Sequence, residues 1–470
     1  MNERFQDLDP ELDYRFGWRC LLPLHLGRRV NCLGFTTREK DFLYHVMDER
    51  SPEGETGALQ GWIINADGIH VNAVLADILA PDSSWFAAVG TGRRLARLKN
   101  LAAAHYEIEE YALLPPNQSR VVVPLAPLGA LRAGLHLHRP GRKTARWAIA
   151  LSSLLARFGC TLPLRKKGLF IGIRDEAANG FSSHPATACS LEPRLKPKDF
   201  PIDPRRITRG KAALYLGNPE PGRKTVLLPL EKLPPQKIIK MGETPTARQA
   251  LQNEKETLEV LTRTPLRNNV PAVLDWQENS AAALLTLEYR ERSRISRRVM
   301  GEAVVDFLTL LASMDSRTLP MKRFLADDPR FRFIRRSEDA LLQALAEWLE
   351  RRSAAGTQVF LHRAHGDFAP WNYAWTGRGL FVFDWEESRA AETALADAFS
   401  YAVFPAVYVS GFHDPVKVLS EALALAGRVA AKAGLRPMDV PVHAVLWLCP
   451  RIHHHALYRT LLRMVLDRFP

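Results

Sequence analysis

The sequence predicts an α+β fold in which a small β-rich lobe precedes a larger helical lobe, with a separate α/β domain before both. Three observations support this prediction. β-like segments cluster in residues 212–288, helical patterns dominate the chain after residue 288, and strand and helix patterns alternate in residues 61–116. A chain of 470 residues is also long enough for about two or three domains.

A proline-rich stretch marks the predicted domain boundary. Residues 181–205 contain five prolines and little periodicity, so they cannot continue a helix or a central strand. We therefore expect an N-terminal α/β domain over residues 1–180, a linker over residues 181–205 and a second domain over residues 206–470.

The composition is that of a soluble globular protein, with 46% hydrophobic and 24% charged residues. The net charge of +13 is scattered and not interleaved with aromatic residues, so no nucleic-acid partner is expected. No secretory signal is expected at the N-terminus, and no apolar run is long enough to span a bilayer. The cysteines form no CxxC pair, which argues against a zinc ribbon or a disulfide framework and fits a reducing cytoplasm; they lie at positions 20, 32, 160, 189 and 449.

The helix predicted after Met241 has clear start signals, because Thr244 can cap it and Pro245 suits the first helical position. Glu254 falls on its apolar stripe, where an ionised carboxylate is costly unless a cation compensates it. The preceding strand, KIIKMG, offers Lys240. We therefore predict an ion pair between Lys240 and Glu254. The stripe itself comprises Ala247, Ala250, Leu251, Leu258 and Leu261.

The densest chemical signal is HGDFAPWN at residues 365–372, followed by FDWE at residues 383–386. Between them, two alternating segments flank TGRG, which predicts a hairpin. Asn372 enters the first strand and Asp384 leaves the second, so both lie at the same end of the hairpin. Asp367 precedes Asn372 by five residues. Two carboxylates and an amide then converge on one point, and such oxygen ligands suit Mg²⁺.

Phosphoryl transfer requires a base at the acceptor hydroxyl, metal ions on the phosphates and a lysine clamp. Asp367 is the predicted base, and Asn372 and Asp384 are the predicted metal ligands. Lys240 is the predicted phosphate clamp, held by Glu254. His365 is expected to orient the loop and not to carry a proton.

These motifs resemble those of the aminoglycoside phosphotransferase and choline kinase superfamily, relatives of protein kinases. That family has a strand lysine, a helix glutamate, a hinge, HxDxxxxN and an Asp before Trp-Glu. The same order is found here at Lys240, Glu254, the TLEYR hinge with Glu288, Asp367, Asn372 and Asp384. The resemblance covers roughly residues 205–470. It implies a bilobal protein-kinase-like domain that uses ATP and Mg²⁺ on a small hydroxyl-bearing acceptor.

Two departures from the family pattern stand out. The turn GNPEPG, at the place of the nucleotide loop, is not a GxGxxG motif. After FDWE the family usually has Gly and Pro before another Asp, whereas here Asp397 stands in the matching place without them. The second departure concerns the floor of the acceptor site and not the metal site.

The expected function is an ATP-dependent small-molecule phosphotransferase in the cytoplasm. Two alternatives remain open: a kinase-like scaffold without turnover, and a two-function protein with an N-terminal methyltransferase-like domain. The acceptor is also open. Glu386, Glu387 and Glu392 could receive a cationic amine, as in choline or aminoglycosides, or be surface charge at a helix start. An uncharged sugar, or a sugar unit of a cell-surface polysaccharide pathway, is equally compatible.

The stretch from Asp77 through AVGTGRRLARLKN to EEYALLPP resembles the closing half of class I methyltransferases. The Gly-rich cofactor loop of that family is not found near a first strand, so we expect no useful affinity for S-adenosylmethionine.

The C-terminal segment IHHHALYRTLLRMVLDRF is predicted to be one helix. Its consecutive histidines, His453 to His455, would point to different sides of that helix and could not form one chelate. The helix has a basic face with Arg459, Arg463 and Arg468, and it is expected to lie on the kinase lobe in preference to a membrane surface.

Overall fold

The computed structural model describes residues 21–22, 29–48, 60–70, 79–80, 83–114, 121–126, 131, 167–174, 212–216, 222–230, 232–279, 282–293, 295–331, 333–334, 337–409 and 414–470. The predicted linker, residues 181–205, lies outside these ranges. The chain divides into two compact units. Unit 1 comprises Met1–Leu251 and Val273–Arg290, and unit 2 comprises Gln252–Ala272 and Glu291–Pro470.

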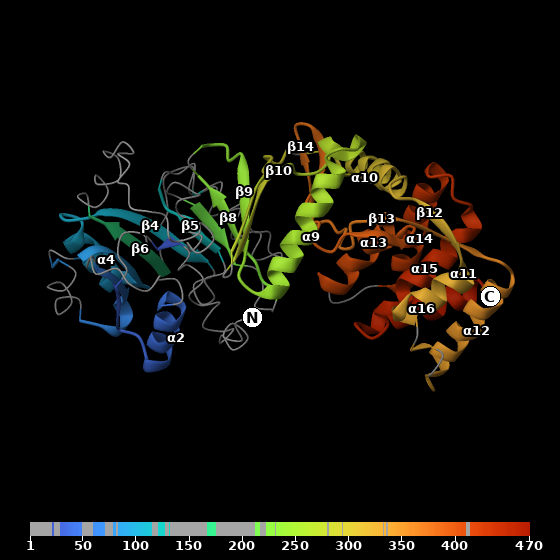
Figure 1. Ribbon diagram of the computed structural model, residues 1–470, viewed down its shortest axis with the longest axis horizontal. Coiled ribbons are helices and arrows are strands. Elements are labelled where there is room, and N and C mark those ends of the chain that lie inside the picture. The colour runs from blue at the N-terminus through green and yellow to red at the C-terminus, as the bar shows by residue number, and fades with distance from the viewer. Residues whose placement is uncertain are drawn as a thin grey trace, which may run out of the picture. The chain divides into compact units, whose positions relative to one another are not determined.

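Unit 1 is built on one sheet with the strand order β1-β2-β3-β6-β4-β5-β7-β8-β9-β11-β10 (Figure 1). In chain order its strands are β1 (Arg29–Leu33), β2 (Gln60–Asn65), β3 (Ser83–Thr91), β4 (Glu107–Leu114), β5 (Val121–Pro124), β6 (Lys167–Ile173), β7 (Ala212–Tyr215), β8 (Thr225–Pro229), β9 (Lys237–Gly242), β10 (Val273–Glu278) and β11 (Ala283–Glu288).

The N-terminal part of this sheet alternates with helices, as the sequence predicts. Strands β1, β2 and β3 are parallel, and β6 runs antiparallel to both of its neighbours, β3 and β4. Helix α2 (Thr37–Asp48) follows β1, and helix α4 (Gly92–Ala102) follows β3. The GTGRR motif therefore lies where β3 ends and α4 begins.

The sheet continues from this N-terminal part into the predicted small lobe. Strand β5 pairs antiparallel with β7, so that Val121 lies opposite Tyr215 and Val122 opposite Leu214. Strands that precede and follow the predicted linker thus belong to one sheet and one compact unit. A separate preceding domain is not confirmed.

Most predicted elements of the small lobe are observed. Strands β7, β8, β9 and β11 lie within residues 212–288, the range predicted to be rich in β-strands. Helix α9 (Pro245–Leu261) starts where expected, because Thr244 Oγ1 accepts a hydrogen bond from the Ala247 N–H at 3.1 Å. Strand β10 was not predicted. Its residues are partly or fully exposed, so it lacks the apolar alternation that marks a strand.

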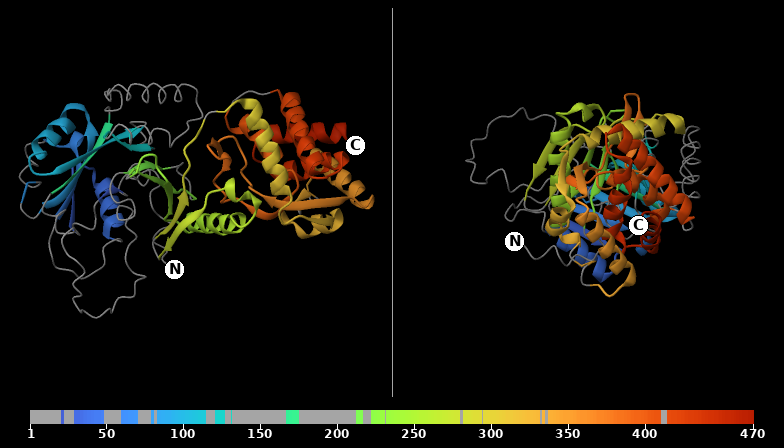
Figure 2. Two further views of the ribbon diagram at one scale, coloured as in Figure 1. Left: turned by 90° about the horizontal axis from the view of Figure 1, so that it is seen from above. Right: turned by 90° about the vertical axis from the view of Figure 1, so that its right-hand side faces the viewer.

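Unit 2 is mainly helical, and its helices gather into one body (Figure 2). The helices are α10 (Arg297–Ala312), α11 (Met321–Asp327), α12 (Ala340–Ala354), α13 (Ala396–Tyr408), α14 (Pro415–Lys432), α15 (Val440–Leu448) and α16 (Ala456–Arg468). Strands β12 (Arg317–Pro320), β13 (Gln358–Ala364) and β16 (Arg389–Thr393) form one small sheet, and β14 (Tyr373–Thr376) and β15 (Gly379–Val382) form a hairpin. None of the helices in the described ranges has the length and apolar character needed to cross a bilayer.

The start of the C-terminal helix was predicted wrongly. Helix α16 begins at Ala456, and His453 and His454 lie in the preceding turn. His455 is the N-cap: its backbone is extended, and its Nδ1 accepts from the Leu457 N–H at 3.1 Å. The expected packing is confirmed, because Arg459 donates to Asp339, the N-cap of α12, at 2.6 Å.

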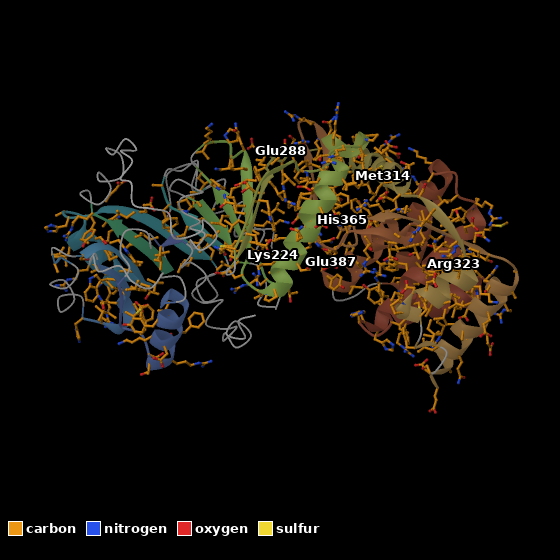
Figure 3. All side chains as sticks on the ribbon, in the orientation of Figure 1. Lys224, Glu288, Met314, Arg323, His365 and Glu387 are labelled. Carbon is orange, nitrogen blue, oxygen red and sulfur yellow. The ribbon has the colours of Figure 1, made fainter. Side chains whose placement is uncertain are left out.

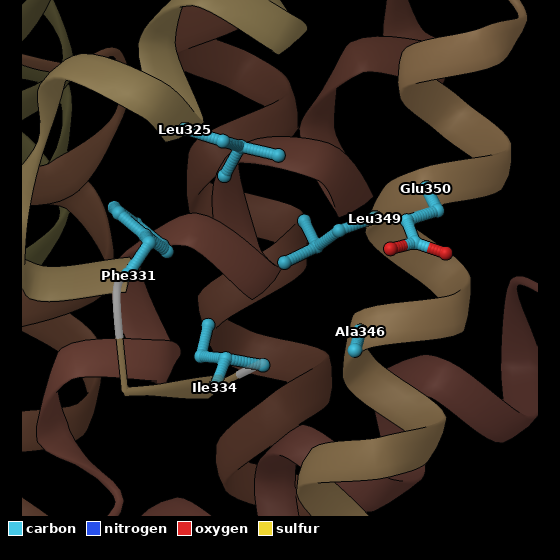
Figure 4. Close-up of a pocket in the computed structure, with 6 residues that line it drawn as sticks. All are labelled: Leu325, Phe331, Ile334, Ala346, Leu349 and Glu350. Carbon is cyan, nitrogen blue, oxygen red and sulfur yellow. The ribbon is translucent and has the colours of Figure 1, made fainter. Parts of the chain in front are cut away.

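A small apolar pocket lies between α11, the short 3₁₀ turn Pro329–Phe331 and α12 (Figure 4). None of the predicted site residues lines it, so we assign it no part in the chemistry. Its lining consists of Leu325, Phe331, Ile334, Ala346, Leu349 and Glu350.

Candidate active site

The predicted hairpin is present and brings its two flanking residues together. Strands β14 and β15 pair from Tyr373 opposite Val382 to Thr376 opposite Gly379. Beyond the Tyr373–Val382 pair, the Phe383 N–H donates to the carbonyl of Asn372 at 2.9 Å. Asn372 and Asp384 therefore lie at the same end of the hairpin, as the sequence predicts.

Asp367 is held beside this end of the hairpin. Asn372 Nδ2 donates to Asp367 Oδ2 at 2.7 Å and to the main-chain oxygen of Asp367 at 2.8 Å. The indole N–H of Trp371 is a second donor to the carboxylate. Burial and, next, the negative charge of Asp384 raise the pKa of Asp367 to about 6, against the opposite effect of the two donors. Such a carboxylate is ionised at neutral pH but more basic than usual, which suits a general base.

His365, labelled in Figure 3, is fully buried. It connects the Asp367 loop to the strand that leads to Asp384. Its Nε2–H donates to the carbonyl of Phe383 at 3.0 Å, while its Nδ1 accepts from the Asp367 N–H at 3.3 Å. These two bonds select one neutral tautomer, with the proton on Nε2. The ring also packs against Trp385, with ring centroids 4.6 Å apart.

Asp397 binds the backbone of the same loop. Its Oδ2 accepts from the His365 N–H at 2.6 Å and its Oδ1 from the Gly366 N–H at 3.1 Å. The residue lies in the first turn of α13 and is only 1% exposed. Burial raises the pKa of Asp397 to about 7, although both N–H donors lower it. The sequence marked Asp397 only by its place after FDWE, and the two backbone bonds show what its carboxylate contacts.

Gly366 occupies a position that only glycine fits. Its φ of +89° lies in the left-handed region, and a Cβ there would be 2.2 Å from the carbonyl oxygen of Glu387. The backbone before Asp367 and the loop after Asp384 are therefore in direct contact.

Asp384 belongs to a group of three carboxylates. Its ligand atoms and those of Glu254 and Glu386 all lie within 4.8 Å of one another. Glu254 is fully buried and accepts from the Trp385 N–H at 3.3 Å. Asp384 itself has a φ of +73°, a strained value for an L-residue that is typical of functional sites. Carboxylate oxygens suit a hard cation such as Mg²⁺, so the residues fit the expected metal.

Asn253 was not predicted. Its Nδ2 donates to the carbonyls of Glu386 and Ser388, the latter at 3.2 Å. It therefore ties the loop after Asp384 to helix α9, next to Glu254. The sequence contains no signal for this contact, because the partners are 133 and 135 residues away.

Lys240 and Glu288 belong to unit 1. Lys240 lies on β9 between Val226 of β8 and Leu285 of β11, and it is 8% exposed. Glu288 ends β11, and its carboxylate is bound by the Arg290 guanidinium at 2.7 and 2.9 Å (Figure 3 labels Glu288). Because Lys240 belongs to unit 1 and Glu254 to unit 2, their pairing stays a prediction.

The three acidic residues after Asp384 have different surroundings, and their role toward an amine stays a prediction. Glu392 is buried on β16, where it accepts from the Thr393 N–H and from Arg389. Glu386 lies in the carboxylate cluster, and only the exposed Glu387 faces Asp367, whose pKa its charge raises. None of the three begins a helix, since α13 starts at Ala396, so the helix-start interpretation is wrong.

A comparison with protein-family models matches residues 231–402 to the phosphotransferase enzyme family. This segment contains every site residue predicted from the motifs. The resemblance to aminoglycoside phosphotransferases and their relatives is thereby confirmed for this part of the chain.

Solved structures similar to this chain include three kinases of small molecules. A streptomycin–ATP ternary complex of an aminoglycoside phosphotransferase is 14% identical over 54% of this chain and 90% of its own, with a TM-score of 0.35. An aminoglycoside phosphotransferase from Streptomyces rimosus with ADP and streptomycin is 17% identical over 51% and 90%, with a TM-score of 0.31. An amicoumacin kinase with AMP-PNP and Ca²⁺ is 10% identical over 55% and 87%, with a TM-score of 0.36. A search of curated proteins found no match.

Proposed function

We propose that this protein transfers the γ-phosphoryl group of Mg-ATP to a hydroxyl of a small molecule. The observation that carries the proposal is the Asp367 carboxylate, held by Asn372 and Trp371 on a loop locked against the residues around Asp384. The family match over residues 231–402 supports phosphotransferase activity for the same segment.

In this proposal Asp367 accepts the proton of the acceptor hydroxyl as its oxygen attacks the γ-phosphorus. The bond between that phosphorus and the bridging oxygen breaks, and ADP leaves. Asn372 points its Nδ2 at Asp367, so its Oδ1 is the atom offered to a cation, together with the carboxylate of Asp384. Mg²⁺ held there would neutralise charge on the phosphates.

The nucleotide contacts remain proposals taken from the motif order. Lys240 is proposed to hold the phosphates and Glu288 to mark the hinge at the adenine. Glu254 is proposed to have two roles: it orients Lys240, and it accepts the hydrogen bond from the Trp385 N–H next to Asp384.

The acceptor is proposed to approach Asp367 beside two aromatic side chains. The Trp371 ring meets Tyr408 edge to face at 6.4 Å, and Tyr408 is 63% exposed. An exposed ring next to a bound indole offers apolar area to the non-reacting part of a small molecule. Tyr408→Ala is therefore expected to raise the KM for the acceptor and to leave nucleotide affinity unchanged.

The decisive experiment compares three aspartate variants. A panel of amino alcohols, aminoglycosides and sugars would first be screened for ADP release. Asp367→Asn should abolish transfer but leave ATP binding nearly intact, whereas Asp384→Asn should weaken Mg-ATP binding and activity together. Asp327→Asn is the matched control, because Asp327 is exposed and its ion pair with Arg323 lies at the surface.

A wild-type turnover rate for Asp367→Asn with the true acceptor would show that the role of this residue is assigned wrongly. Nucleotide binding without ADP release from any acceptor would instead favour the scaffold alternative.

A further inference from the structure

Strand β5 completes the sheet that carries Lys240. The strands of the predicted small lobe are ordered β7-β8-β9-β11-β10, and β5 pairs with the outer side of β7 (Figure 1). Without β5, the backbone N–H and C=O groups along that side of β7 would be exposed as a free edge. Only β7 and β8 separate β5 from β9, and Val226 of β8 lies directly opposite Lys240.

Both faces of the sheet are packed across this junction. Side chains alternate between two faces along each strand, and each face has its own apolar cluster. On one face Val122 belongs to the same cluster as Leu214, Leu227 and Ile239. On the other face Val121 and Val123 belong to the same cluster as Ala213 and Leu228. Strand β5 is thus buried on both faces of the sheet. Such burial is typical of an interior strand and not of an edge strand.

The second of these clusters extends to the predicted hinge. Tyr289, which follows Glu288, packs against the cluster that contains Val121, Val123 and Leu125. The Tyr289 N–H also donates to the carbonyl of Gln236, just before β9, at 2.8 Å. The N-terminal half therefore contacts β7, the strand before the GNPEPG turn, and Tyr289, the residue after Glu288 of the predicted hinge.

We propose that the N-terminal half is a positioning part of the nucleotide-binding sheet, and that β5 is the element through which it acts. By pairing with β7 and filling both faces of the junction, β5 fixes the register of β7 and β8 against β9 and so the position of Lys240. Strand β5 touches no nucleotide in this proposal. Its effect on nucleotide affinity rests on the proposed function, whereas its effect on β7 does not.

The test uses the full chain and two matched valine variants. Val122→Ala removes two methyl groups from β5, opposite Leu214. Val89→Ala makes the same change on β3, which is buried in the same cluster but lies three strands away from β5. Hydrogen exchange of the β7 amides and calorimetric titration with Mg²⁺ and AMP-PNP would be measured for both variants and the wild type.

We expect both variants to melt at a lower temperature but only Val122→Ala to change the nucleotide lobe. Its β7 amides should exchange about tenfold faster, and its Kd for AMP-PNP should rise about threefold or more. Val89→Ala should leave both quantities at the wild-type value. Val121→Ala, on the opposite face of β5, supplies a second variant with the same expected direction.

Equal effects of the β5 and β3 variants on β7 exchange would overturn the proposal, since they would show only a general loss of stability. Faster β7 exchange with an unchanged Kd would overturn the link to Lys240. If the wild-type chain bound no AMP-PNP, the proposed function would fail, and the exchange measurement alone would still decide whether β5 positions β7.

Discussion

Replacing Gly366 with alanine should damage both the stability and the activity of the protein, and the geometry gives the size of the effect. An L-residue held in the left-handed region costs about 1–2 kcal/mol. The new Cβ would also lie 2.2 Å from the Glu387 carbonyl oxygen and 2.8 Å from its carbon. These are backbone atoms, so relief requires a backbone shift, and overpacking of this kind costs about 1–3 kcal/mol. The expected loss in unfolding free energy is therefore about 2–5 kcal/mol.

Gly356 provides a matched control for this substitution. Its φ is +72°, but a Cβ there would meet nothing within 4 Å. Gly356→Ala therefore carries the conformational cost without the contact, and the two variants should differ by about 1–3 kcal/mol. Urea unfolding of both variants and the wild type measures this difference.

The activity of Gly366→Ala should fall further than its stability requires. Gly366 precedes Asp367, and its N–H is bound by Asp397, so any shift that relieves the contact also moves the predicted base. A displacement of about 1 Å at such a group can cost about a hundredfold in rate. ADP release below the unfolding temperature should show this loss, while Gly356→Ala keeps the wild-type rate. A Gly366→Ala protein as stable and active as Gly356→Ala would refute the reasoning.

Three further predictions concern buried charge. Within the described residues, neither ring nitrogen of His443 has a hydrogen-bond partner. Burial lowers the pKa of this histidine from 6.5 to about 3. The free energy of unfolding should therefore decrease as the pH falls from 6.5 toward 3, by at most about 1.4 kcal/mol per pH unit. His443→Phe should flatten this part of the stability–pH profile, and an unchanged slope would contradict the assignment. Asp397→Asn should cost about 2–3 kcal/mol in urea unfolding, because an amide NH₂ would face one of two N–H donors. No loss would indicate that the wild-type carboxyl is protonated. Lys240→Met and Glu254→Gln should each impair ATP affinity or turnover, and the double variant should lose less than their sum. Strict additivity in stability and activity would exclude the pairing.

Local signals were sufficient for the elements that carry the site. Thr244 and Pro245 marked the start of α9, and the helical period placed Glu254 on its buried face. The alternation around TGRG gave the hairpin, and hence the common location of Asn372 and Asp384. In each case the determining interactions lie within a few residues of one another, so the sequence pattern contains them.

Contacts between distant segments were not predictable in this way. Asn253 reaches carbonyls more than a hundred residues away, and β5 pairs with a strand that lies beyond the proline-rich stretch. Neither contact leaves a periodic or compositional trace. The start of α16 was predicted wrongly for a different reason. Three histidines were counted into the helix, although His453 and His454 lie in a turn and His455 is the N-cap.

The sheet shared by β5 and β7 also limits how this gene can change. The proline-rich stretch has the composition of a domain linker. Recombination there would nevertheless separate two strands, β5 and β7, that share backbone hydrogen bonds and apolar contacts. A protein with an unrelated N-terminal half would have β7 as an unpaired edge strand. Both apolar clusters of the sheet would also lose the side chains of β5. Selection should therefore transmit the two halves together and confine tolerated insertions to the connections between strands.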